Sequence, residues 1–130
     1  MTKLELMGAD LILVPLGEIV RFVDFAIVEN LENQLQNIFG EKKNTSLIKR
    51  FYHFNNIREK FYSEDLNWAI HQLGAKYLER ISDGKKIIIN TLCYQDSERL
   101  IKPLLSSGDY EFLEYLAKEI KDVERYKLIK

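Results

Sequence analysis

"PLGEIVRFVDFAIVEN", at residues 15–30, is the stretch that decides the fold. It is mostly apolar, but Glu18, Arg21 and Asp24 place a charge at every third position. A helix that crosses a membrane needs about 20 nearly uncharged apolar residues. The longest uncharged segment in this region lies between Asp10 and Glu18, so the stretch is predicted not to span a bilayer.

Apolar residues in and after this stretch recur at the i, i+3, i+4, i+7 spacing of one helix face. They are Leu16, Ile19, Val20, Val23, Ile27, Leu31, Leu35 and Ile38. Polar residues such as Glu18, Arg21 and Glu29 gather on the opposite side. The spacing therefore predicts a single amphipathic helix over residues 16–39.

The first half of this helix has an unusually wide apolar surface, because Phe22, Phe25, Ala26 and Val28 extend it beyond one face. Such a helix needs neighbours on nearly all sides. Two alternatives follow. Either it is a central helix that the rest of the domain surrounds, or its second flank, with Phe22 and Phe25, contacts another subunit or a partner.

Four more helices are predicted downstream from apolar spacing. Their ranges are 46–62, 64–81, Asp96 or Ser97 to Leu105, and 109–123. Ser63, followed by two acidic residues, is a typical N-cap signal, and Asp109 is the expected cap of the last helix. Gly40 is the expected C-terminal cap of the first helix.

One segment has the character of a strand. "KIIINTLCY", at residues 86–94, is rich in β-branched and aromatic residues. A strand needs a partner for its backbone, and the candidates are residues 11–16 ("LILVPL") and 126–130 ("YKLIK"). The predicted fold is therefore mainly α, a compact bundle of four to five helices, with a small two- or three-stranded sheet and an α+β class as the alternative.

Composition indicates one ordinary globular domain spanning residues 1–130. Apolar residues make up 46% and charged residues 30%, and the net charge of −1 argues against nucleic-acid binding through a bulk positive field. Cys93 is the only cysteine, so we expect a small buried side chain and no disulfide. Because the start at Met1 lacks the features of a secretory signal, a cytoplasmic location is predicted.

Motifs for catalysis, cofactors or metals are not recognisable in the sequence. His53 and His71 are the two histidines, and neither has a second ligand at metal-binding spacing. Nucleophile elbows, P-loops and dinucleotide-binding turns are missing. We therefore predict no cofactor and no metal, and an enzyme with a dispersed site near His53 or His71 ranks only as the second alternative.

The basic segment at residues 42–60 offers the first alternative. Lys49, Arg50 and Arg58 are interleaved with Phe51, Tyr52 and Phe54, a pattern that suits phosphate contacts with base stacking. It is also the pattern of an ordinary helix with aromatic residues inward. The last predicted helix is acidic. It could dock on this basic segment, or the two could present opposite charges to a partner.

By elimination, we expect a small protein-binding module that masks or docks a macromolecular partner, such as an adaptor, an inhibitor, or an immunity-like or antitoxin-like protein. Self-association is equally compatible with an extra apolar flank. The expected partner-binding residues are Phe22, Phe25, Lys49, Arg50 and Arg58.

Overall fold

A computed structural model describes residues 5–57 and 60–129 of the chain, with six α-helices and two sheets. The α-helices are α1 (Gly8–Ile19), α2 (Leu31–Glu41), α3 (Ser46–Phe51), α4 (Glu64–Gln72), α5 (Leu92–Asp96) and α6 (Ser107–Leu116). The strands are β1 (Phe25–Glu29), β2 (Asn55–Ile57), β3 (Lys60–Tyr62), β4 (Leu78–Ile81), β5 (Lys86–Asn90) and β6 (Val123–Tyr126). A π-helical turn at Ser97–Ile101 and a 3-10 turn at Lys102–Leu104 continue α5, and further 3-10 turns lie at Ser82–Gly84 and Ala117–Glu119.

The larger sheet has four strands in the order β4-β5-β1-β6, and all its pairs are antiparallel. β1 is paired on both sides, with Phe25 opposite Asn90 of β5 and opposite Tyr126 of β6. β4 and β6 are therefore the edge strands. β2 and β3 form a separate two-stranded hairpin.

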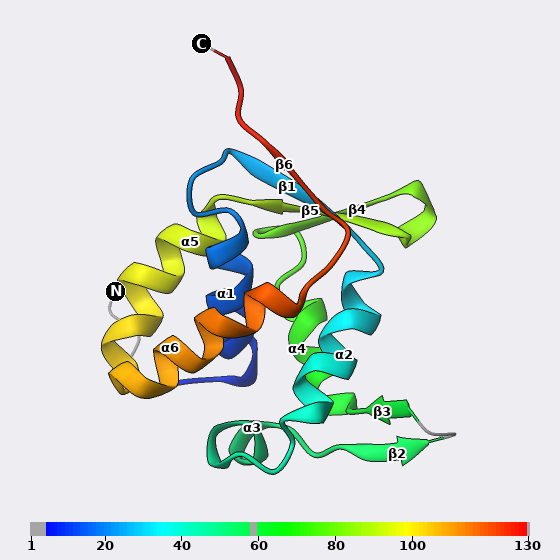
Figure 1. Cartoon of the computed structure of the whole chain (residues 1–130), viewed down its shortest axis with the longest axis vertical. Helices are drawn as coiled ribbons and strands as arrows, with labels where there is room; N and C mark the ends of the chain where they lie inside the picture. Colours follow the sequence, from blue (N-terminus) through cyan, green and yellow to red (C-terminus); the bar gives the residue numbers. More distant parts are fainter. Residues whose placement is uncertain (1–4, 58–59, 130) are drawn as a thin grey trace.

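The molecule is elongated, and its two sheets lie at opposite ends (Figure 1). The four-stranded sheet occupies one end, the helices α1, α2, α4, α5 and α6 fill the middle, and α3 with the β2–β3 hairpin forms the other end. Residues buried in the described part of the chain still form one continuous hydrophobic cluster.

Helix α1 is the centre of this cluster. Nine of its twelve residues are buried, and it packs against α4, α5 and α6. Gly17 allows the close approach to α5, because a Cβ atom there would lie 2.9 Å from the Cys93 carbonyl oxygen. Pro15 also lies inside α1, although a proline removes one backbone hydrogen bond from a helix. The packing of α1 on all sides compensates for this loss.

The two faces of the four-stranded sheet differ in burial. Ala26 and Val28 of β1 and Ile87 and Ile89 of β5 are fully buried, whereas the alternating residues, such as Ile27, are half-buried. Period-2 alternation is typical of an antiparallel sheet with one covered face. The less buried face includes Phe25, whose ring stacks on that of Tyr126 with centroids 4.9 Å apart.

The prediction of one helix over 16–39 is wrong. α1 ends at Ile19, β1 occupies 25–29, and α2 begins at Leu31 after Asn30, which has a left-handed backbone with φ of 54°. Most of the residues assigned to the apolar face are buried, so the spacing predicted burial but not conformation. The β-branched residues of 25–29 pair with strands on both sides, and these contacts outweigh a helical pattern.

The strand predictions were partly right. Residues 86–90 form β5, but 91–94 leave the sheet and enter α5. The partner at 11–16 is wrong, because these residues are the middle of α1. The C-terminal partner at 126–130 is wrong as well, because β5 pairs with β1 and β4. The C-terminal strand β6, at 123–126, joins the same sheet by pairing with β1.

The helix predicted from Asp96 or Ser97 to Leu105 agrees with the helical turns that continue α5 to Leu104. The other downstream helix predictions, for 46–62, 64–81 and 109–123, extend past the observed helices. The segment 46–62 divides into α3 and the β2–β3 hairpin, and 64–81 divides into α4 and β4. Ser63 is the N-cap of α4 as predicted, accepting a hydrogen bond from the Leu66 N–H at 3.2 Å. The last helix is capped by Ser106 rather than Asp109, whose N–H donates to the Ser106 hydroxyl.

Gly40 is a helical residue rather than a C-terminal cap, since α2 continues to Glu41. The fold is thus α+β, the alternative class, with more helix than strand. Among the described residues, no helix combines the length and the apolar character that a transmembrane span requires.

Candidate functional site

Nine large hydrophobic side chains are exposed in the described part of the chain, and five of them lie at one end of the four-stranded sheet. Their segments meet where β1 begins, and we name these five residues, together with Phe25, the apolar patch. Its members are Phe22, Phe25, Leu92, Tyr126, Leu128 and Ile129. Ile129 belongs to the C-terminal tail, which extends away from the sheet (Figure 1). Exposed apolar clusters of this kind mark interaction sites more often than isolated exposed residues do.

Strand pairing brings the apolar patch together from three distant segments. Phe25 lies opposite both Tyr126 and Asn90. The Asn90 side chain accepts a hydrogen bond from the Leu92 N–H at 2.9 Å. The β1–β6 pairing thus joins the start of β1 to the end of β6, and the β1–β5 pairing adds the start of α5.

A carboxylate holds the segment after β6 against the patch. The Leu128 N–H donates to Asp24 Oδ2 at 2.6 Å. Phe22, in the loop before β1, has 78% of its surface exposed.

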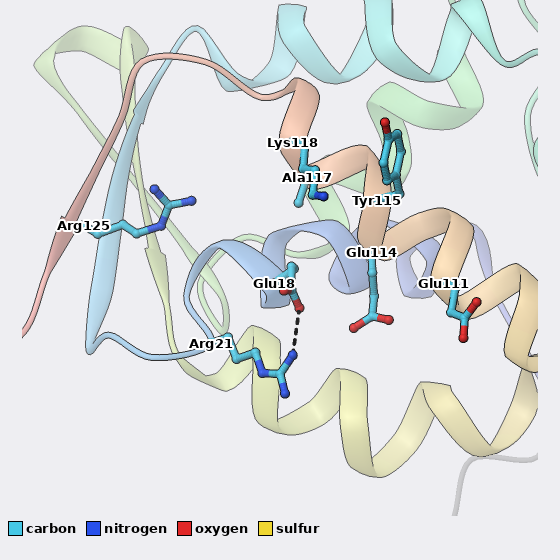
Figure 2. A pocket seen from close by; sticks show the side chains of 8 residues that line it. All are labelled: Glu18, Arg21, Glu111, Glu114, Tyr115, Ala117, Lys118 and Arg125. Atoms are coloured by element: carbon cyan, nitrogen blue, oxygen red, sulfur yellow. Dashed lines mark ion pairs between the residues drawn. The ribbon is translucent and has the colours of Figure 1, made fainter.

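A charged pocket of about 440 Å³ lies beside the patch, between the end of α1, the helix α6 and strand β6 (Figure 2). We name it the charged pocket, and its lining residues are Glu18, Arg21, Glu111, Glu114, Tyr115, Ala117, Lys118 and Arg125. Figure 2 shows Glu18 and Glu114 approaching the same space from α1 and α6.

Arg21 belongs to both surfaces. Its guanidinium pairs with Glu18 at 3.8 Å in the charged pocket. The same group lies over the ring of Phe22 at 4.9 Å and over that of Tyr94 at 5.8 Å. The apolar patch and the charged pocket are therefore adjacent parts of one surface.

The carboxylates of the charged pocket are only partly neutralised. Burial and the neighbouring carboxyl of Glu18 raise the pKa of Glu114. The Arg125 Nε–H is directed to the Ile19 carbonyl oxygen at 3.0 Å, and the Lys118 ammonium lies over the Tyr115 ring. No ion pair among the described residues joins a cation to Glu111 or Glu114.

The structure separates the sequence-predicted site residues. Phe22 and Phe25 lie at the sheet end, whereas Lys49 and Arg50 are exposed on α3 at the opposite end (Figure 1). Arg58 falls outside the described residues. Nucleic-acid binding through 42–60 stays a prediction, and none of the ion pairs between described residues joins this segment to the acidic α6.

Neither histidine lines the charged pocket. The His53 backbone N–H donates to Asp65, and the His71 ring lies 3.3 Å from the Arg80 guanidinium. Within residues 5–57 and 60–129, no group of three or more His, Cys, Asp or Glu side chains is arranged to hold a metal ion. The histidines thus offer no converging catalytic group at this surface.

Cys93 and Asp96 are buried residues of α5. Burial raises the pKa of the Cys93 thiol, which opposes nucleophilic reactivity. Burial acts against the charge of Asp96, but hydrogen bonds from Tyr77, Arg99 and Lys76 outweigh it and lower the pKa of this carboxyl. The Tyr77 hydroxyl donates to Asp96 at 2.6 Å and fastens α5 to the segment before β4.

Comparisons of the chain with protein-family models, with curated proteins and with solved structures find no match.

Sequence reasoning missed the charged pocket as a unit. The Glu18–Arg21 spacing and the acidic face of the last helix were visible separately. Their meeting depends on the packing of α6 against α1, which no local pattern encodes. Tyr126 and Leu128 were missed for the same reason, since only the β1–β6 pairing brings them to Phe25.

Proposed function

We propose that this protein is a binding module for another protein, which docks on the apolar patch and the adjoining charged pocket. The observation that carries the proposal is the gathering of five of the nine exposed large hydrophobic side chains at one end of the sheet. Burial of apolar area is the main favourable contribution to association, and aromatic residues are enriched at the centre of interfaces.

The proposed partner segment carries an apolar side chain next to a lysine or arginine. The apolar side chain would cover Phe22 and Tyr126, which are exposed. The cation would enter the charged pocket, where burial and repulsion from the Glu18 carboxylate raise the pKa of Glu114. An opposite charge there relieves the repulsion, which favours a partner of that sign.

The position of β6 at the edge of the sheet supports the proposal that a partner binds at this surface. β6 is an edge strand, and its described pairing is with β1 alone. Edge strands leave backbone donors and acceptors unpaired, which a partner segment can use by strand addition. The patch and the edge together would present both apolar side chains and main-chain groups to one extended segment.

The test compares Phe22→Asp with a matched control, Met7→Asp, because both residues are exposed and Met7 lies at the opposite end of α1. Each full-length variant is immobilised, and captured proteins are identified from native lysate. The affinity of a captured partner is then measured by titration calorimetry with purified proteins. We expect Phe22→Asp to weaken binding by more than about tenfold, as for an aromatic interface anchor, and Met7→Asp to leave it unchanged.

Retention of the partner by Phe22→Asp would overturn the proposal. Sedimentation equilibrium separates the case of self-association. A dimer that Phe22→Asp dissociates would show that a second copy of the chain, rather than another protein, covers the patch. Phe22 is preferred to Phe25 for this test, because Phe25 is half-buried and stacks on Tyr126.

A further inference from the structure

A groove lies between α2, β3 and α4, and its lining includes no residue of the apolar patch. It has a volume of about 540 Å³, which is within the usual range for small-molecule sites. A second hollow of about 350 Å³ shares two lining residues, Tyr62 and Asn67. The two hollows therefore adjoin at these residues, and we name them together the amide groove.

The amide groove has a firmly held floor. The Gln36 side-chain amide donates to the Ser63 carbonyl oxygen at 2.9 Å, and its oxygen accepts from the Ser63 N–H at 2.8 Å. Gly40 of α2 permits the close approach of β3, because a Cβ atom there would lie 2.3 Å from the Phe61 Cβ. β3 and the start of α4 are therefore fixed against α2.

Three asparagine side chains line the groove with their hydrogen-bonding capacity unused. They are Asn33 and Asn37, one helical turn apart on α2, and Asn67 on α4. None of these three amide groups has a hydrogen bond with the described residues. Each offers two donors and one acceptor oxygen, so the three amides present paired donors and acceptors that carry no charge of their own.

Exposed aromatic rings lie beside these amides. Trp68 has 67% of its surface exposed, and Tyr62 is also exposed. Both line the second hollow, and Tyr62 lines the first as well. Exposed tryptophan and tyrosine rings suit ligands that place one apolar face on the ring and polar groups at the edge.

The charges around the groove disfavour a phosphodiester. Glu64 and Asp65 line the hollow next to Trp68, where they would repel a nucleic-acid backbone. Glu32 is engaged by Arg80 at 3.1 Å. Among the described lining residues Lys60 is the only cation, and phosphate contacts depend on several. Carboxylates are, however, good acceptors for ligand hydroxyl groups.

We infer that the amide groove binds a neutral saccharide. The apolar C–H face of one pyranose ring stacks on Trp68 or Tyr62, and its hydroxyl groups hydrogen-bond to Asn33, Asn37 and Asn67. This site is independent of the proposed protein-binding surface, because the two have no lining residue in common.

Trp68 is the only tryptophan of the chain, so its intrinsic fluorescence reports on the groove directly. The full chain is titrated with neutral disaccharides of glucose, galactose, mannose and N-acetylglucosamine, and separately with mixed-sequence single-stranded DNA. We expect a saturable change of emission with at least one disaccharide and none with DNA. The double variant Asn33→Ala/Asn37→Ala should weaken that binding by roughly tenfold or more, since it removes at least two hydrogen bonds.

The matched control is Asn44→Ala, which removes an exposed amide outside the groove. It should bind the disaccharide as the wild type does. Saturation-transfer NMR extends the test to Trp68→Ala, which should lose the signal from the sugar ring protons. The inference is overturned if no disaccharide of the panel binds, if DNA binds instead, or if the double asparagine variant binds with unchanged affinity.

Discussion

Gln34 and Gln36, two residues apart on α2, fasten opposite ends of the molecule with the same chemistry. The Gln36 side chain exchanges two hydrogen bonds with the backbone of Ser63, at the hairpin end. The Gln34 side chain exchanges two with the backbone of Lys121, just before β6, at 2.9 and 2.7 Å. Gln34 Nε2 also donates to the Glu29 carbonyl oxygen at 2.7 Å.

The difference between the two contacts is their depth. Gln36 is 7% exposed and Ser63 is fully buried, whereas the bonds of Gln34 lie at the surface. A buried backbone group that loses its partner pays its full desolvation cost, but an exposed one is resolvated by water. The two pairs of hydrogen bonds therefore contribute unequally to stability, although their geometry is similar. The hairpin end depends more strongly on Gln36 than the sheet end depends on Gln34.

The largest effect is expected for Gln36→Met, which preserves side-chain length and removes both hydrogen bonds. It leaves the Ser63 N–H unpaired in a buried position, whereas the Ser63 carbonyl oxygen keeps the hydrogen bond from the Asn67 N–H at 3.0 Å. We therefore expect a loss of about 1–3 kcal/mol in the free energy of unfolding. Urea denaturation followed by circular dichroism measures this loss. A change below about 1 kcal/mol would show that water replaces the amide and that Ser63 is not sealed.

A smaller effect is expected for Gln34→Met, the matched change at the sheet end. Water can reach the Lys121 and Glu29 backbone groups, so we expect a loss of about 0.5–1 kcal/mol. Hydrogen exchange should show faster amide exchange in β6, with the groove residues of α4 unaffected. Equal losses of stability for the two methionine variants would contradict the comparison, because depth would then not decide the cost.

The smallest effect is expected for Glu114→Gln, at the sheet end. The pKa of Glu114 is raised in the folded protein, so the native state binds the proton more tightly than the unfolded state does. Its charged form therefore costs stability above the raised pKa, and this cost disappears as the pH falls below the unfolded value of about 4.3. Glutamine removes the cost, so the variant should be slightly more stable at pH 7.

Urea midpoints of Glu114→Gln and of the wild type at pH 7 and pH 3.5 check this prediction. The gain, under about 0.5 kcal/mol as is usual for a surface change, should be present at pH 7 and absent at pH 3.5. Glu111→Gln is the control, because it removes the same charge from the same helix without touching the Glu18 contact. A gain of the same size at both pH values would exclude repulsion between Glu18 and Glu114 as its cause.

Burial could be predicted from the sequence more reliably than conformation. Leu16, Ile19, Leu31 and Leu35 are buried as predicted, although a strand interrupts the helix that was to carry them. Local signals succeeded where one residue decides an element, as at the Ser63 cap. They failed at 25–29, where the alternation of Ala26 and Val28 was obscured by apolar residues on both sides.

The candidate surfaces were predictable only in part. Phe22 and Phe25 were proposed from a wide apolar surface, and the structure places both in the apolar patch for a different reason, the loop and strand that replace the helix. The amide groove had no sequence signal, because single asparagines and aromatic residues are common in any chain. Only the closeness of α2, β3 and α4 gives them a shared hollow.

Hydrophobic composition and spacing by themselves determined which residues leave water, that Ser63 caps a helix, and that 86–90 is extended. Burial free energy and local capping depend on a residue and its near neighbours. Tertiary structure alone decided that 25–29 is a strand and which side chains meet at each end of the molecule. The reason is that β-pairing depends on partners some 60 to 100 residues away in the chain, as in the pairing of β1 with β5 and β6. The assembly of each surface depends on equally distant partners. Local periodicity carries no information about them.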